Sequence, residues 1–349
     1  MASSSQPQAL TLHLFLCSNT KKKRNLPLVA TVDRLYERPI WWHVLDASRN
    51  LLFPFVGLLG IIHYVLTDHY STFDVLLFLL FFISTGIGIT VGFHRLFAHR
   101  AFKAKQWLRL TLAVLGSFAW QRPLFVWVAR HRLHHAHADK KGDFHSPYVR
   151  HDGTKIKGAL NQFLHSHYTW LHWYDPIVTR ESPVTKHLSS DSALRWMDEQ
   201  YDFLALLSIL LPGLLSMLFY GTTEGFIRGV IWGGLGRICI LLHLTWLIDS
   251  VTHKFGNKPY VTSDGSTNCP VLDWVMLGEG YHNNHHAFPS SPCFGFAQKQ
   301  FDVGWLFIKG MQQLGQVYDL KAIPDARRRQ FRSSYQLQPS SQVLQSPTR

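Results

Sequence analysis

The sequence predicts an all-α integral membrane protein, in which four transmembrane helices form two hairpins and a helical cap covers one end. Three observations predict this fold. Of the 349 residues, 46% are hydrophobic and only 16% are charged, whereas soluble domains carry about 25% charged residues. Four apolar runs approach the roughly 20 residues that a helix needs to cross hydrocarbon. Histidines cluster where these runs end.

The first hairpin is expected from two uncharged runs, residues 51–67 and 75–93, which a short link at residues 68–74 separates. A fifth apolar stretch, residues 107–128, follows this hairpin. A fifth crossing would place the histidine clusters on opposite sides of the membrane. We therefore expect a buried or interfacial helix there, which also suits the polar and helix-breaking residues within it: Arg109, Gln121, Arg122 and Pro123.

The second hairpin is expected from the uncharged run at residues 203–223 and the run at residues 229–248, joined around residues 224–228. The last run is interrupted by Arg237. Charges inside membrane helices are often functional, so Arg237 either marks a solvent pathway or faces protein within the bundle.

Two hairpins return the chain to the side on which it started. Residues 94–200 and the chain after residue 249 should therefore share one face with the N-terminus. The basic run at residues 21–24 indicates that this face is cytosolic. The net charge of +13 comes largely from basic residues beside apolar runs, which favours contact with anionic lipid headgroups over nucleic acid.

The chain divides into a membrane domain at residues 41–322 and two flanking segments. Residues 1–40 are expected to be disordered or to act as a targeting segment, and the basic, polar residues 323–349 to be disordered. The four cysteines are scattered without a CxxC pair, which favours neither a disulfide framework nor a zinc finger.

Histidines form three clusters on the predicted cytosolic face, one pair and two triplets. Residues at positions i, i+3 and i+4 share one helix face, so each of the two triplets can point at one centre. The members of the pair are five residues apart, about 140° around an ideal helix, and reach one centre only through a distorted turn, or serve two centres. The pair is His94 and His99, and the triplets are His131, His134, His135 and His282, His285, His286.

This pattern indicates a site for two metal ions. Eight histidines are too many for one zinc ion, which takes four ligands, but suffice for two metals of five or six coordination. The clusters contain no cysteine, which argues against iron–sulfur and structural zinc sites. Imidazole suits Zn, Cu, Fe or Ni, so the spacing does not choose the metal.

At these clusters the sequence resembles the membrane-bound fatty acyl desaturases, in particular the acyl-CoA delta-9 branch. The family pattern HRxxxHR, HRxHH and GExxHNNHH occurs here as HRLFAHR, HRLHH and GEGYHNNHH. The resemblance extends to WVARHRLHH, DFHSP, SHYTW and TWLIDSVTHKFG, and it covers roughly residues 41–320.

The resemblance implies four transmembrane helices, a cytosolic domain and two ferrous ions held by the histidines. It adds His253 as a ninth ligand. Asp249 stands where the family usually has Asn, four residues before His253. Asp249 can therefore face the same centre as a further ligand, or instead pair with a nearby lysine. Residues expected to support the ligands are Glu279, Asn283 and Asn284.

The implied reaction is O2-dependent removal of two hydrogens from adjacent methylenes of a palmitoyl or stearoyl chain, carried as acyl-CoA or acyl-lipid. No acid or base of the protein attacks an unactivated C–H bond, so the metal centre supplies the reactivity. An apolar tunnel should hold the chain. Candidate tunnel residues, which could shorten it in favour of palmitoyl or simply face lipid, are Phe78, Phe81 and Phe82, together with Trp127.

Electrons must come from a separate protein, because the chain has neither an HPGG haem motif nor a GxGxxG motif. Cytochrome b5 or ferredoxin would suit the basic cytosolic face. The endoplasmic reticulum is the expected membrane, with the plastid or a bacterial inner membrane as alternatives. Two further functions stay open: a fatty acyl or sterol hydroxylase with the same centre, and a histidine-rich metal carrier.

Overall fold

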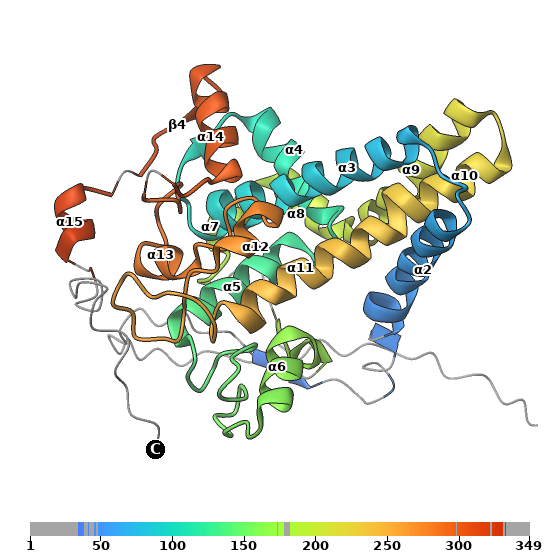
Figure 1. The fold of residues 1–349 in the computed structure, drawn as a ribbon. Coiled ribbons are helices and arrows are strands. Elements are labelled where there is room, and N and C mark those ends of the chain that lie inside the picture. Colours follow the sequence, from blue (N-terminus) through green and yellow to red (C-terminus); the bar gives the residue numbers. More distant parts are fainter. Residues whose placement is uncertain are drawn as a thin grey trace, which may run out of the picture.

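A computed structural model describes residues 34–37, 41, 45–46, 48–172, 174–177, 182–297, 299–321, 323–330 and 332. Within these residues the fold is mostly helical. Long apolar helices extend to one side, and a cap that carries the histidine clusters lies at their other end (Figure 1). Most of the flanking segments at residues 1–40 and 323–349 lies outside the described residues, except for the short elements β1 and α15.

Four helical segments are long and apolar enough to span a membrane, at Arg49–Leu66, Thr72–Ala98, Tyr201–Tyr220 and Thr223–Val251. This confirms the predicted number of spans and their pairing. Three of them contain stretches of π-helix. In chain order the segments consist of η1 (Ser48–Leu52) with α2 (Phe53–Leu66), α3 (Thr72–Ile87) with η2 (Gly88–Ala98), α9 (Tyr201–Tyr220), and α10 (Thr223–Gly229) with η4 (Val230–Gly236) and α11 (Arg237–Val251).

The second hairpin turns earlier than the sequence analysis expects. Residues 224–228 are helical within α10, and the chain turns at Gly221 and Thr222. Gly221 adopts a left-handed conformation with φ 69°, which glycine reaches without steric cost. The Thr222 side chain then accepts a hydrogen bond from the Gly225 N–H and caps α10. Two residues therefore suffice for the turn.

Arg237 faces protein rather than a solvent pathway. Its side chain is fully buried and donates hydrogen bonds to the carbonyl oxygens of Gly233, Phe118 and Ser208, at 2.8, 2.7 and 2.9 Å. One side chain thus ties the fourth span to the third span and to the segment after α4. Interior polar contacts of this kind satisfy a charge that lipid could not.

The fifth apolar stretch does not cross the membrane in one helix. It forms α4 (Gln106–Ser117) and the start of α5 (Leu124–His137), separated by a bend. Trp120 and Arg122 in this bend have positive φ values of 63° and 84°, which no continuous helix allows. The stretch is not among the candidate spans, as expected, but it forms two helices where one was predicted.

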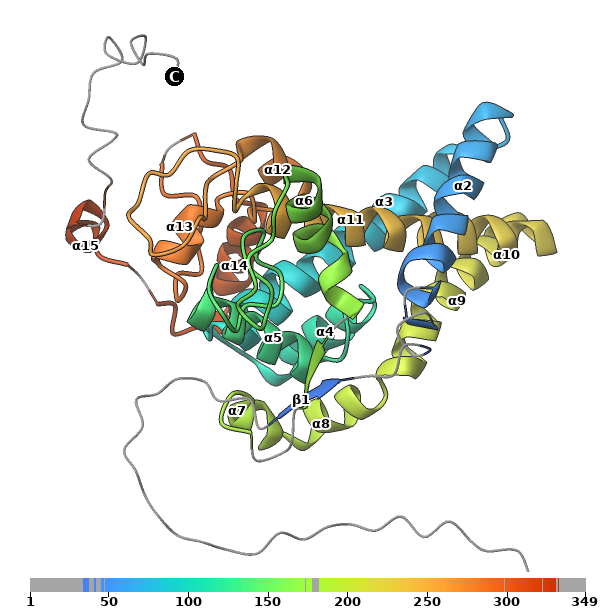
Figure 2. The ribbon, with the colours of Figure 1, turned by 90° about the horizontal axis from the view of Figure 1, so that it is seen from below.

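The cap surrounds α5 and the helix end of η2. Seen from below, α5, α13 and α14 gather on one side, while α2 and α10 extend away on the other (Figure 2). Two small antiparallel sheets pair β1 with β3 and β2 with β4. The remaining elements are β1 (Arg34–Glu37), β2 (Lys103–Ala104), α6 (Ala159–His167), η3 (Thr169–His172), β3 (Tyr174–Ile177), α7 (Lys186–Ser189), α8 (Ser192–Glu199), α12 (Pro270–Val275), α13 (His282–Ala287), α14 (Val303–Gln313), β4 (Val317–Tyr318) and α15 (Asp325–Gln330).

Candidate metal centre

The end of η2 brings His94 and His99 to the same side of the chain. The N–H of His99 donates to the carbonyl oxygen of His94 at 3.0 Å, which is the i→i+5 bond of a π-helix. This wider turn places the two rings with centroids 4.9 Å apart. Of the two possibilities left open by the sequence, the distorted turn is the one observed.

The two histidine triplets do not each face one centre, which corrects the expectation from helical spacing. On α5, His134 and His135 are consecutive and therefore about 100° apart around the axis, so they point to different sides. The ring of His135 lies with His131, and that of His134 lies with His253. On α13, His285 is separated from His282 and His286 in the same way. Both helices lie between two centres and contribute to each.

Nine histidines form two groups, within each of which the candidate ligand nitrogens all lie within 4.8 Å of one another. In the first group, Nε2 of His99 is 2.7 Å from that of His131, and Nε2 of His135 is 2.8 Å from that of His285. In the second group, Nε2 of His253 is 3.1 Å from that of His282. The first histidine group is His94, His99, His131, His135 and His285, and the second is His134, His253, His282 and His286.

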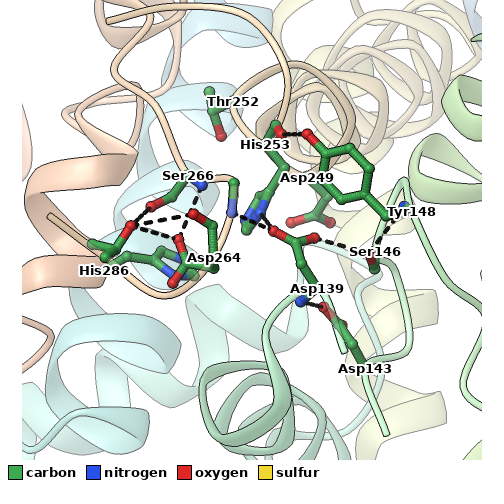
Figure 3. A network of polar contacts seen from close by, with 12 residues as sticks. Asp139, Asp143, Ser146, Tyr148, Asp249, Thr252, His253, Asp264, Ser266 and His286 are labelled. Carbon is green, nitrogen blue, oxygen red and sulfur yellow. Dashed lines mark hydrogen bonds and ion pairs between the residues drawn. The ribbon is translucent and has the colours of Figure 1, made fainter. Parts of the chain in front are cut away.

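Four carboxylates contact histidine rings at Nδ1, the nitrogen that does not face the neighbouring histidines, and so orient these rings. Oε2 of Glu279 lies 2.7 Å from Nδ1 of His94. Three aspartates do the same for rings of the second group, and Figure 3 shows two of them, Asp139 beside His253 and Asp264 beside His286. A ring that donates its Nδ1–H to a carboxylate keeps Nε2 unprotonated for a metal. The three pairs in the second group are Asp143–His134 at 3.0 Å, Asp139–His253 at 2.9 Å and Asp264–His286 at 3.1 Å.

Of these carboxylates, the sequence analysis identified Glu279 alone. Asp139, Asp143 and Asp264 lie in loops, where no helical period marks them. The one sequence feature that could have pointed to any of these aspartates was the position of Asp143 in the DFHSP stretch. The support of the ligands by Asn283 and Asn284 stays a prediction. Both residues bond neighbouring loops: Asn283 bonds the backbone of Tyr260 in both directions, and Asn284 donates to the carbonyl of Phe294.

The protonation of the rings fits metal binding. Burial, together with the neighbouring rings, holds the pKa of six histidines well below its usual range, so that they are neutral: His99, His131, His135, His282, His285 and His286. Burial opposes protonation of His134 too, but Asp143 raises its pKa to about 9. A positive charge is therefore favoured at this ring, where a metal ion would replace the proton.

The charges around the groups fit two divalent cations. Burial opposes ionisation of the four carboxyls, but the histidine contacts outweigh it and keep their pKa values below the usual range: Asp139, Asp143, Asp264 and Glu279. Buried negative charges are costly without compensation. Two divalent ions would balance them, and a purely nitrogen donor set suits iron as well as Zn, Cu or Ni.

Asp249 lies beside the centre but outside both histidine groups. One of its oxygens is 3.7 Å from Nδ1 of His145. His145 in turn stacks on His134, with ring centroids 4.2 Å apart. The contact of Asp249 is thus with a histidine, not with the lysine considered from the sequence. Its direct ligation of a metal remains a prediction.

A narrow cavity of about 90 Å³ reaches the first histidine group. His131 and Trp127 line it near the metal site, and Asp249 lines it from α11. Phe78, Phe81 and Phe82 are not among its lining residues: Phe78 stacks on Phe82, and Phe81 is buried near Arg237. The other lining residues are five apolar or aromatic ones, Trp120, Trp170, Leu171, Leu242 and Trp246, and six polar ones, Asn50, Gln121, Arg122, Arg130, His145 and Thr245.

Comparison with known proteins finds one matching family and several similar proteins. Residues 73–299 match the family described as fatty acid desaturase. The sn-1 stearoyl-lipid 9-desaturase of Anabaena variabilis is 35% identical over 274 residues, covering 78% of this chain and 93% of the relative. A hex-5-enoyl acyl-carrier-protein acetylenase of Moorena producens is 35% identical over 249 residues, covering 69% and 74%. Delta-9 acyl-lipid desaturase 2 of Arabidopsis thaliana is 34% identical over 269 residues, covering 76% and 81%.

Proposed function

Because this chain belongs to the fatty acid desaturase family, we propose that it introduces a cis double bond at carbon nine of a saturated long-chain acyl group. The observation that carries this proposal is the convergence of nine histidines into two groups at the end of an apolar cavity. The chain is a multi-pass membrane protein with four apolar spans, which suits a substrate that resides in lipid.

The two histidine groups would each hold one ferrous ion. When bound, the iron pair supplies the oxidising power that, with dioxygen, removes hydrogen from an unactivated methylene. The overall change balances as follows: one CH2–CH2 unit, O2, two electrons and two protons give one CH=CH unit and two waters. Glu279 and Asp139 keep the rings of His94 and His253 oriented with Nε2 toward the ions.

The cavity would position the acyl chain and exclude water. Gln121 donates to the hydroxyl of Thr245 at 2.8 Å, and Trp127 donates to Gln121 at 3.2 Å. These bonds satisfy the polar groups of Gln121, Thr245 and Trp127 in the cavity wall, so these side chains can face an alkyl chain. Trp127 and His131 are also stacked, with centroids 5.0 Å apart, which supports a position for the chain beside the first histidine group.

We propose a lipid-linked acyl chain as the substrate, with acyl-CoA, the form expected from the sequence, as the second candidate. Two relatives at 35% and 34% identity are named for lipid-linked chains. Relatives named for acyl-CoA are also similar, among them an icosanoyl-CoA 5-desaturase of Limnanthes douglasii at 30% identity. We retain the endoplasmic reticulum as the proposed membrane and cytochrome b5 or ferredoxin as the proposed electron donor.

Expression in desaturase-deficient yeast tests the function. We expect new monounsaturated acids with the double bond at carbon nine, located by mass spectrometry. When the cells are fed a labelled saturated fatty acid, the labelled monounsaturated product should appear in lipid before it appears in the acyl-CoA pool. The His285→Ala variant serves as the control without an intact first group. Hydroxylated acids without unsaturated products, from protein present at normal levels, would contradict the proposal and favour the hydroxylase alternative.

A further inference from the structure

A second cavity lies on the cap, away from the acyl cavity. Its volume is about 450 Å³, and four Lys or Arg side chains line it against one carboxylate, that of Asp319. We call it the basic pocket. It is formed by the end of η2, β2, the start of α4, α7 and the residues after β4, and its cationic side chains are Arg100, Lys103, Arg109 and Lys321.

Positive charge in the basic pocket exceeds what nearby acids neutralise. Lys103 pairs with Asp319 at 2.8 Å, and Arg109 pairs with Asp191 at 3.0 Å. Arg100 and Lys321 add two further exposed cations. Clustered like charges in a concavity create a positive potential that attracts an acidic partner.

The wall of the basic pocket is continuous with the first histidine group. Arg100 directly follows His99, and Arg132 directly follows His131. The guanidinium of Arg132 donates to the carbonyl oxygen of Ala98 at 2.8 Å. His187 lines the pocket, and its Nε2 lies 3.0 Å from the carbonyl oxygen of Phe97, another lining residue. Backbone and hydrogen bonds therefore connect the pocket to two of the histidines.

The basic pocket and the acyl cavity have no lining residue in common. The acyl cavity meets the first histidine group at His131 and Trp127, whereas the basic pocket lies behind His99. A partner in the basic pocket could thus act on the metal centre while an acyl chain occupies the cavity.

We propose that the basic pocket is the docking site of an acidic one-electron carrier protein. This inference rests on the proposed function, whose balance needs two electrons that the described residues have no redox group of their own to supply. Two reduced carriers dock in turn, each is oxidised by one electron, and two protons are taken up as O2 becomes two waters and the acyl unit loses two hydrogens.

The shape of the pocket favours a protein over a phosphate-bearing small molecule. Its cations are spread over four separate segments, and Arg100, Lys103 and Lys321 are exposed at the rim. Tyr318 lines the pocket and is 50% exposed. Exposed aromatic and arginine side chains, here Tyr318 and Arg100, are typical of a protein interface, whereas a phosphate site requires cations that converge on one point.

The test uses the full-length enzyme with the pair of substitutions Arg100→Gln and Lys321→Gln. Turnover is measured against the concentration of reduced cytochrome b5, and separately of reduced ferredoxin, at low and high salt. We expect the KM for the effective carrier to rise about fivefold or more at low salt, because removing rim charges slows association, and its salt dependence to weaken. The matched control is Lys155→Gln with Lys157→Gln, two exposed lysines elsewhere on the cap.

A single-turnover measurement separates this proposal from the proposed function. Enzyme reduced anaerobically with dithionite, freed of reductant, loaded with substrate and exposed to O2 needs no carrier, and the pocket variant should match the wild type. Absence of unsaturated product from the wild type would reject the proposed function itself. The docking proposal is wrong if product forms but the pocket variant keeps the wild-type KM for the carrier. It is also wrong if the control pair raises the KM for the carrier as much as the pocket pair does. Competition by inorganic phosphate with an unchanged carrier KM would also overturn it, in favour of a phosphate site.

Discussion

Nδ1 of His94 lies 2.7 Å from Oε2 of Glu279, deep in the protein and between the second membrane span and the α12–α13 segment. The same carboxylate accepts from the Thr90 hydroxyl and lies 3.6 Å from the guanidinium of Arg95. Glu279 thus fixes both the position and the tautomer of a ring in the first histidine group. Contacts of this kind determine how tightly a histidine site holds its metal.

Replacing Glu279 by Gln should weaken metal binding without removing a ligand. We expect a fall of about 10- to 100-fold in iron affinity, because the amide holds the His94 ring less firmly and supplies no charge. Competition against a chelator, followed by iron analysis, measures the change. The exposed Glu224→Gln is the matched control. Equal iron retention by both variants would show that the Glu279 contact has no influence on the site.

The substitution Asp249→Asn distinguishes the two roles considered for this carboxylate. Because Asp249 contacts His145 and lies outside both histidine groups, we expect the iron content to stay within about twofold of wild type. We also expect a lower KM for the acyl substrate, since a carboxyl group that lines the cavity is removed. Loss of one iron per chain would instead identify Asp249 as a ligand.

Phe82 provides a test of chain-length selection. It packs against the same buried apolar cluster as Trp127, which lines the acyl cavity. Phe82→Ala removes volume from this cluster, so we expect the ratio of stearoyl to palmitoyl product to rise about threefold or more, in line with the cost of a misfit of one or two methylenes. Leu79→Ala, on the exposed side of the same helix, is the control. An unchanged ratio, or a wild-type preference for stearoyl, would remove Phe82 from the tunnel.

Asp198 makes the stability of the cap depend on pH. Burial raises the pKa of this carboxyl to about 6, from an ordinary value of 3.8. The folded protein therefore retains a proton that the unfolded chain has lost, and its stability falls as pH rises between about 4 and 6. Asp198→Asn keeps an acceptor for the Phe125 N–H, a bond of 2.8 Å, without this penalty.

Thermal unfolding in detergent at pH 5 and pH 7 measures the effect. The Asp198→Asn variant should exceed the wild type in unfolding midpoint more at pH 7 than at pH 5. Asp202→Asn, at a carboxylate whose side chain is 83% exposed, should show no such difference. If the difference in unfolding midpoint between Asp198→Asn and the wild type were equal at both pH values, the assigned effect of burial on the Asp198 pKa would be contradicted.

The membrane topology could be predicted from the sequence because lipid imposes a simple requirement. Each span needs about 20 apolar residues, and the four runs stand out by composition. The turn at Gly221 could not be placed, since a left-handed glycine shortens the link without changing its polarity. The bend at Trp120 and Arg122 was not predicted, since a single buried or interfacial helix was expected over residues 107–128.

The histidine clusters were visible in the sequence, but their division between two groups was not. His134 and His135 reach different groups because α5 passes between the centres, and only tertiary packing sets that path. The π-turn that unites His94 with His99 leaves no distinct sequence period. The aspartates behind the rings come from loops, whose folded positions helical spacing does not predict.

The metal content of the purified protein tests the central claim most directly. Nine histidines in two groups, with four carboxylates behind them, should hold two iron ions per chain. Protein expressed with iron available and analysed by elemental mass spectrometry should contain about two irons per chain, a ratio that follows from two sites of four or five imidazoles each. One iron per chain, or zinc bound in preference when both metals are supplied, would contradict a di-iron centre.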